Sequence, residues 1–161
     1  MKIELNSIGT IYSEFENIES MPIQPTGAKG IKGKIIIKDK YKKGLKDLEC
    51  FSHINLIYLL HKVEGYNLEV KPFMDIESHG IFATRSPKRP NPIGTSIVKL
   101  DRIDENILYV SNIDILNKTP LIDIKPYVPQ LYEYTIDELK IGWFENNYNK
   151  AKYKKSDDRF K

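Results

Sequence analysis

Short segments rich in Ile, Val and Tyr recur along the chain between Gly, Pro, Asn and Asp residues, and sustained helical periodicity is scarce. The clearest segment is 96–103, where apolar residues fall mostly at every second position, followed by a turn at 104–106 and a second alternating run. The segments expected as strands are 3–12, 33–38, 53–61, 66–71, 80–84, 93–103 and 107–113. This pattern predicts an all-β domain.

Short strands must hide their unpaired edges, and a sheet that closes on itself leaves no edge. We therefore expect a small closed single-sheet β-barrel, with short helical turns at 41–48 and 135–140. The irregular stretch 13–31, which contains Pro22, Pro25, Gly27 and Gly30, is expected to be a long functional loop. We place the barrel domain at 1–145 and a basic C-terminal tail at 146–161.

The charge of the chain is modest, and much of it lies at the C-terminus. A length of 161 residues favours one domain, and a net charge of +3 does not by itself indicate a nucleic-acid-binding protein. Residues 150–161, however, hold six Lys or Arg and two acids. We interpret this tail as a solvated chain end, with contact to RNA phosphates as the alternative.

Several classes of protein are disfavoured by composition. Cys50 is the only cysteine, which excludes an intrachain disulfide framework and a cysteine-cluster metal site. The three histidines, His53, His61 and His79, have spacings that match no compact ligand pattern, so we expect no metal. No apolar run is long enough to cross a membrane and the first residues do not resemble a signal peptide, so we expect a cytoplasmic protein with no membrane partner.

The segment 80–94, GIFATRSPKRPNPIG, differs in chemistry from the rest of the chain. It contains three of the nine prolines, two arginines and no acid. Proline fixes its own φ and restricts the preceding residue, so this connection should be a stiff loop that presents Arg85 and Arg89. Their planar guanidinium groups suit a carboxylate or a phosphate. The alternative is an ordinary proline-stiffened connection with solvated cations.

This segment closely resembles the signature of the TrmO family, S-adenosylmethionine-dependent methyltransferases that act on tRNA. Two further blocks resemble the same family in the same order: Gly44-Leu45 followed by Phe51-Ser52-His53, and Asp114 followed by Thr119-Pro120 and Asp123-Ile124-Lys125-Pro126-Tyr127. The resemblance runs from about residue 5 to residue 130. It implies a closed β-barrel that works as a homodimer and binds its methyl donor near the subunit interface.

The activity implied by this resemblance is methylation of N6 of N6-threonylcarbamoyladenosine at position 37 of tRNA. The chain is too short for the extra C-terminal domain of long family members, so a short form is implied. Two alternatives of another kind remain open: a nonenzymatic module that binds S-adenosylmethionine or RNA, and a methyltransferase for another small substrate.

The resemblance also implies which residues contact the cofactor. The positions that correspond are Pro25, Thr26, Gly27, His61, Lys62, Arg85, Thr95, Ser111, Asn112, Ile113 and Asp114. Three positions depart from the family pattern: Lys62 stands where Gln is frequent, Thr95 where an apolar residue is usual, and Lys118 where a glycine normally lies. A glycine at that last position suggests a backbone with positive φ, which lysine adopts less readily.

The chemistry of the reaction suggests further roles. The target nitrogen carries a delocalised lone pair, which favours either a general base or hydrogen-bond donors that stabilise developing charge on the urea oxygen. Asp114 is the first candidate base, with Asp123 and His61 as alternatives. Lys88, Arg89 and Lys125 are candidates for binding RNA. Tyr127 and Phe82 could stack on a base, although each is as readily a core residue.

Overall fold

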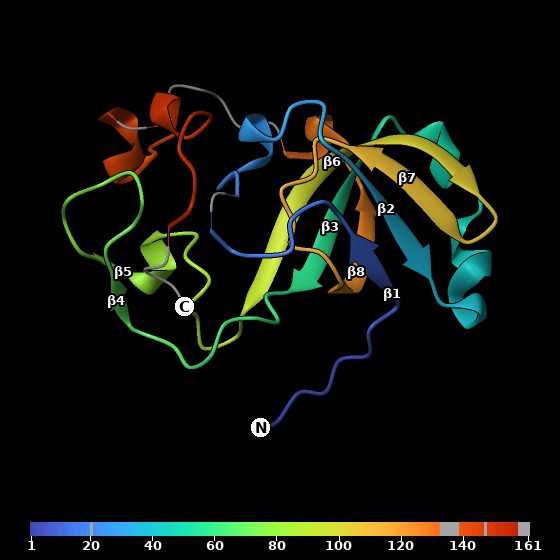
Figure 1. The fold of residues 1–161 in the computed structure, drawn as a ribbon, viewed down its shortest axis with the longest axis horizontal. Helices are drawn as coiled ribbons and strands as arrows, with labels where there is room; N and C mark the ends of the chain where they lie inside the picture. Colours follow the sequence, from blue (N-terminus) through green and yellow to red (C-terminus); the bar gives the residue numbers. More distant parts are fainter. Residues whose placement is uncertain (20, 133–138, 147, 158–161) are drawn as a thin grey trace.

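The computed structural model describes residues 1–19, 21–132, 139–146 and 148–157 (Figure 1). Six strands form a closed barrel in the order β1-β2-β7-β6-β3-β8, and every neighbouring pair is antiparallel. They are β1 (Gly9–Tyr12), β2 (Lys32–Ile37), β3 (His53–Leu59), β6 (Ile93–Asp104), β7 (Ile107–Ser111) and β8 (Thr119–Pro126). The predicted all-β class and the closed barrel are therefore confirmed.

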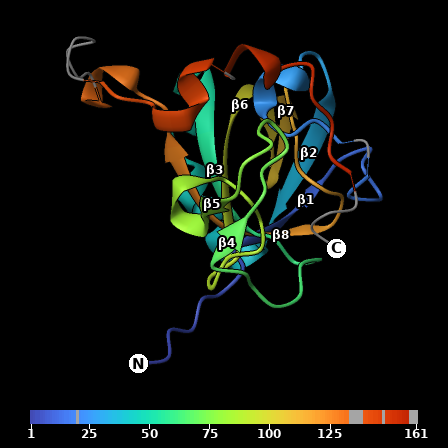
Figure 2. The ribbon, with the colours of Figure 1, turned by 90° about the vertical axis from the view of Figure 1, so that its left-hand side faces the viewer.

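A small lobe lies beside the barrel (Figure 2). It contains the two-stranded sheet of β4 (Glu69–Val70) and β5 (His79–Gly80). The described helical elements are all short 3-10 turns, as expected for a chain with little helical periodicity. They are η1 (Pro25–Gly27), η2 (Asp39–Leu45), η3 (Leu48–Cys50), η4 (Ile81–Ala83), η5 (Pro129–Tyr132), η7 (Gly142–Asn146) and η8 (Tyr148–Lys150).

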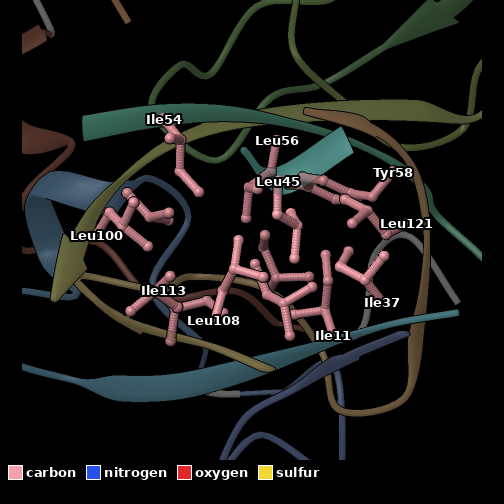
Figure 3. Packing of buried hydrophobic residues seen from close by; sticks show 14 residues of the cluster. Ile11, Ile37, Leu45, Ile54, Leu56, Tyr58, Leu100, Leu108, Ile113 and Leu121 are labelled. Atoms are coloured by element: carbon pink, nitrogen blue, oxygen red, sulfur yellow. The ribbon is translucent and has the colours of Figure 1, made fainter. Parts of the chain in front are cut away.

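The barrel interior is filled by aliphatic side chains that alternate along the strands (Figure 3). On β7, for example, Leu108 and Val110 are buried, whereas the residues between and after them are half-buried. Ile11, Ile35 and Ile54 are fully buried on three other strands. Burial of such side chains stabilises the fold by about 1.5 to 3 kcal/mol each, so the alternation that predicts the strands also provides the core.

Some predicted boundaries are wrong for physical reasons. Of the segment 3–12 only Gly9–Tyr12 is a strand, because Ile3 and Leu5 are exposed and find no partner strand in the barrel. The segment 80–84 is mostly the η4 turn, in which the Thr84 hydroxyl donates to the Ile81 carbonyl. The segment 66–71 pairs only over Glu69–Val70.

Two other expectations differ in outcome. The predicted turn at 41–48 is present as η2 and η3, whereas most of the predicted turn at 135–140 lies outside the described residues.

Strand β8 was not expected from the sequence, because Pro120 and Pro126 interrupt its pattern and proline is usually absent from the interior of a sheet. In the barrel Pro120 lies opposite Thr10, close to the start of β8.

The described part of the basic C-terminal segment packs against the loop that precedes β2. Ser156 donates its backbone N–H to the Met21 carbonyl at 2.9 Å, and the Met21 N–H donates to the Ser156 hydroxyl at 3.0 Å. Pro22 and Lys155 form an isolated antiparallel bridge, and Ala151 is buried. Residues 151–156 are thus anchored on the barrel domain.

Candidate active site

A pocket of about 900 Å³ lies where β3 ends and β6 begins. Its walls come from segments far apart in sequence: the η1 loop, the end of β3, the proline-stiffened segment after η4, the start of β6, residues 114–116, and the C-terminal segment. Figure 2 views the side of the molecule on which the β4–β5 lobe lies. Among the predicted cofactor residues, those that line the pocket are Pro25, Thr26, His61, Lys62, Arg85, Thr95 and Asp114.

The polar centre of this pocket is the carboxyl group of Asp114. Its Oδ1 atom is buried and has no hydrogen-bond partner in the protein. Burial raises the pKa of Asp114 to about 6, although a hydrogen bond with Ser96 and the positive charge of Arg85 act in the opposite direction. A buried, unpartnered carboxylate oxygen is costly, and it commonly marks a place where a ligand completes the site.

Two residues that the sequence analysis did not select support this carboxyl group. The hydroxyl groups of Tyr58 on β3 and Ser96 on β6 are 2.9 Å apart. Either hydroxyl can donate this bond, and Ser96 also favours the ionised form of the Asp114 carboxyl group. Burial, followed by the charge of Asp114, raises the pKa of Tyr58, so its hydroxyl stays protonated.

Gly94 makes room for the Tyr58 ring. The two residues lie opposite each other on β6 and β3, and a Cβ atom at Gly94 would lie 2.6 Å from Cζ of Tyr58. Real Cβ atoms do not approach a ring so closely. The last glycine of the proline-stiffened segment therefore determines where the Tyr58 hydroxyl is placed.

The two arginines of the proline-stiffened segment have different environments. Arg85 is exposed, lines the pocket, and donates from Nη2 to the Thr95 carbonyl at 2.9 Å. Arg89 is half-buried and donates from Nη1 to the carbonyls of Ile81, Thr84 and Ser86, at 3.2, 2.8 and 3.4 Å. Arg89 also lines the pocket, but its Nη1 is engaged by the carbonyls of its own loop, so Arg85 is the better placed of the two to bind a ligand.

His61 forms part of the wall near the end of β3. Its Nδ1 lies 3.3 Å from the Thr119 hydroxyl. Partial burial, and then the charge of the neighbouring Lys62, lower the pKa of His61, which favours a neutral ring at physiological pH. Asp123, the other candidate base, forms an ion pair of 2.9 Å with Lys125 on β8 and does not line the pocket.

The third cofactor block lies in the pocket only from Asp114 onward. Ser111 faces the outside of the barrel and donates to Asp101, Asn112 accepts from the Gly30 N–H at 2.9 Å, and Ile113 is fully buried in the core. Instead of these three residues, Ile115 and Leu116 continue the pocket wall. Position 118 has a positive φ of 60° that lysine adopts here.

Element η7 contributes aromatic side chains to the pocket. Trp143 and Phe144 line the pocket, and the Trp143 indole donates to the Ala83 carbonyl at 2.9 Å while its ring stacks on His79 at 4.7 Å. Gly27 does not line the pocket, but a Cβ atom there would lie 3.1 Å from the Lys152 carbonyl oxygen. The absence of a side chain at Gly27 therefore lets the C-terminal segment approach the η1 loop. No pattern in the sequence indicated these contacts.

The comparisons with known proteins agree with this architecture. The family model for the tRNA-methyltransferase O N-terminal domain matches residues 10–132. The chain belongs to the TrmO family. It is 47% identical over 154 residues to a probable S-adenosyl-L-methionine-binding protein of Pyrococcus abyssi, a match that covers 95% of this chain and 82% of the relative.

Two further similarities bear on function. The crystal structure of TrmO from Pseudomonas aeruginosa matches with a TM-score of 0.71 and 33% identity, over 89% of this chain and 63% of that one. The tRNA (adenine(37)-N6)-methyltransferase of Rattus norvegicus is 40% identical over 87 residues, which are 52% of this chain and 20% of the rat protein. The chain thus corresponds to only part of these larger proteins.

Among the described residues, no helix is long and apolar enough to span a membrane. The same residues contain no group of three or more His, Cys, Asp or Glu side chains placed to hold a metal ion.

Proposed function

We propose that this protein transfers a methyl group from S-adenosylmethionine to N6 of N6-threonylcarbamoyladenosine at position 37 of tRNA. Membership of the TrmO family, the name of the rat relative and the name of the Pyrococcus relative support a methyltransferase of this kind. The observation in the structure that carries the proposal is the Asp114 carboxylate, buried in a large pocket with one oxygen unpartnered.

The pocket fits S-adenosylmethionine in size and chemistry. Its volume of about 900 Å³ is within the range of small-molecule sites. Leu60, Ile115 and Phe144 provide apolar walls, and the buried Ser86 hydroxyl, like Asp114, has no hydrogen-bond partner in the protein. When bound, S-adenosylmethionine supplies an electrophilic methyl group on a positively charged sulfur. Arg85 would bind the carboxylate of this donor.

Asp114 would act as the general base. Methylation would form a bond from N6 to the methyl carbon while the carbon–sulfur bond of the donor breaks, so that the donor leaves as a neutral thioether. The carboxylate would accept the proton that N6 loses. A pKa of about 6 keeps this group ionised at neutral pH while leaving it more basic than an ordinary aspartate. Ser96 and Tyr58 hold the carboxylate in one orientation through their hydrogen-bonded hydroxyls.

We further propose that the protein is a cytoplasmic homodimer. The outer face of β3 and β6 exposes Leu59, Ile93 and Ile97, at 36, 41 and 37% of their surface. Two of them, Ile93 and Ile97, also line the pocket. Exposed apolar side chains beside a binding site are typical of a protein interface, and a second subunit there would help to enclose the pocket.

The activity is tested by incubating the purified protein with S-adenosylmethionine and tRNA that carries threonylcarbamoyladenosine, followed by mass analysis of the nucleosides. We expect a methylated form of this nucleoside, and none when the tRNA lacks the threonylcarbamoyl group. Donor binding without methylated product would support the nonenzymatic module instead. Product formed equally well from a small molecule without RNA would support a methyltransferase for another small substrate.

A further inference from the structure

The barrel wall formed by β2, β7 and β6 is shown in Figure 1. On its outside, Lys32, Lys34, Lys99 and Arg102 are exposed and form a basic surface. Lys32 and Lys99 lie opposite Ser111 on either side of β7, and Lys34 and Arg102 lie opposite Tyr109 in the same way. Neighbouring strands are about 4.8 Å apart, so the Cα atoms of the two basic residues in each row are about 10 Å apart, and the rows are about 7 Å apart. Lys32, Lys99 and Arg102 line a hollow of about 520 Å³ on this surface.

A β-bulge places Arg102 on this surface. The register of β6 against β7 shifts between Leu100 and Arg102, so Asp101 is an extra residue on β6. Asp101 and Arg102 are consequently both exposed, whereas strict alternation would turn Arg102 toward the interior beside Leu100. The guanidinium of Arg102 then lies 3.5 Å from the centre of the Tyr109 ring, which holds it flat on the sheet.

The surface is positively charged in spite of two nearby acids. Asp101 is 3.4 Å from Lys99, and Asp104 is 3.6 Å from Arg102. Within the described part of the chain, Lys32 and Lys34 form no ion pair. Strand β2 also belongs to the most basic stretch of the sequence, 29–46, which has eight lysines and one acid and thus a net charge of +7. Such a surface attracts polyanions.

The outer face of β6 connects this basic surface to the pocket. Thr95, Ile97 and Lys99 are alternate exposed residues on the strand. The first two line the pocket and the third borders the hollow. Four residues of a strand span about 13 Å, so a polymer bound across the basic surface can enter the pocket without leaving the sheet.

We propose that Lys32, Lys34, Lys99 and Arg102 bind the phosphate backbone of the RNA substrate and so align it with the pocket. This inference rests on the proposed function. The basic C-terminal segment lies on the loop before β2 and is the competing candidate for the same role. Phosphate contacts position an RNA without reading its sequence, which suits four cations on a rigid sheet.

The test measures the affinity of the full-length protein for an unmodified tRNA transcript over a series of salt concentrations. We expect Lys32→Ala/Lys34→Ala to weaken binding and to reduce the slope of log affinity against log salt by roughly 1.4 to 1.8, because each lost phosphate contact contributes about 0.7 to 0.9. Lys2→Ala, at an exposed position before β1, serves as the control and should leave the slope unchanged. Affinity for S-adenosylmethionine should be the same in all three proteins.

The outcomes separate this inference from the proposed function. If Lys32→Ala/Lys34→Ala binds and methylates tRNA as the wild type does, with the same salt slope, this inference is overturned but the proposed function is not. The same holds if the salt slope falls only in Lys154→Ala/Lys155→Ala. A polyglutamate chain that displaces tRNA at equal charge concentration overturns the assignment to RNA. A wild-type protein that neither binds nor methylates tRNA overturns both proposals.

Discussion

The Tyr58 hydroxyl lies 2.9 Å from the Ser96 hydroxyl, and this hydrogen bond joins adjacent strands of the barrel directly beneath the pocket. Both residues are buried, so their polar atoms depend on each other and on Asp114. This arrangement explains how an acidic side chain with a raised pKa is kept in one orientation inside a hydrophobic barrel.

Ser96→Ala should move the pH dependence of methyl transfer to higher pH. The substitution removes a hydrogen bond that favours the ionised form of Asp114, so the pKa of the carboxyl group should rise further above about 6. The measurement is the single-turnover rate against pH. Ser7→Ala, which removes a half-buried hydroxyl that donates to the Gly9 carbonyl away from the pocket, is the control. If the rate of Ser96→Ala falls at low pH with the same midpoint as that of the wild type, Ser96 does not lower the pKa of Asp114.

Asp114→Asn should make the protein more stable at neutral pH. The pKa of this carboxyl group is about 6 in the folded state and 3.8 when it is unperturbed, so the folded state binds the proton more tightly than the unfolded state does. The stability that this difference contributes is fully present below pH 3.8 and is lost as the pH rises through about 6. At neutral pH the ionised group therefore costs up to about 3 kcal/mol, which asparagine avoids. Urea unfolding at pH 7.5 and at pH 3.5 should show a stability difference only at the higher pH.

Gly94→Ala should destabilise the fold and reduce activity, because its Cβ would collide with the Tyr58 ring. Overpacking of this kind typically costs about 1 to 3 kcal/mol. Gly44→Ala is the matched control, since a Cβ at Gly44 meets no atom within 4 Å. Thermal unfolding of the two variants provides the comparison, and an equal effect on Tm would show that the close approach to Tyr58 is unimportant.

Arg85→Ala and Arg89→Ala should affect different properties of the protein, ligand binding in the first case and stability in the second. Arg85 is exposed at the pocket, so its loss should weaken S-adenosylmethionine binding by about 1.5 to 3 kcal/mol with little change in Tm. Arg89 bonds to three carbonyls of its own loop, so its loss should lower Tm. Calorimetric titration and thermal unfolding measure the two effects. A lower tRNA affinity without loss of stability in Arg89→Ala would instead favour the RNA-binding role expected from the sequence.

The sequence predicted the barrel and the hairpin of β6 and β7 because alternation of apolar residues is a local signal. It did not predict β8, where Pro120 and Pro126 hide the pattern. A polar residue in an inward-facing position, as Ser96 is between Gly94 and Val98, was the one local sign of the hydrogen-bonded centre. Its partner Tyr58 follows only from the register of β3 against β6, which the sequence alone does not specify.

Most of the cofactor residues that the family resemblance selected line the pocket, but the first three residues of the third block lie outside it. Asp114 lies in the pocket, while Ser111 faces the opposite surface of the sheet and Ile113 the core. The chain leaves the barrel after β7 and turns through Asn112, which has a positive φ of 66°. The direction of each side chain around that turn depends on the backbone, so a residue-by-residue correspondence did not reveal it.

The most direct test of this account is the rate of methyl transfer to threonylcarbamoylated tRNA as a function of pH, for the wild type and for Asp114→Asn. Because Asp114 must be ionised to accept the N6 proton, the wild-type rate should fall about tenfold per pH unit below about 6. The variant should lose most activity and this acidic limb, while still binding S-adenosylmethionine. Wild-type rates in Asp114→Asn, with the same acidic limb, would contradict the central claim.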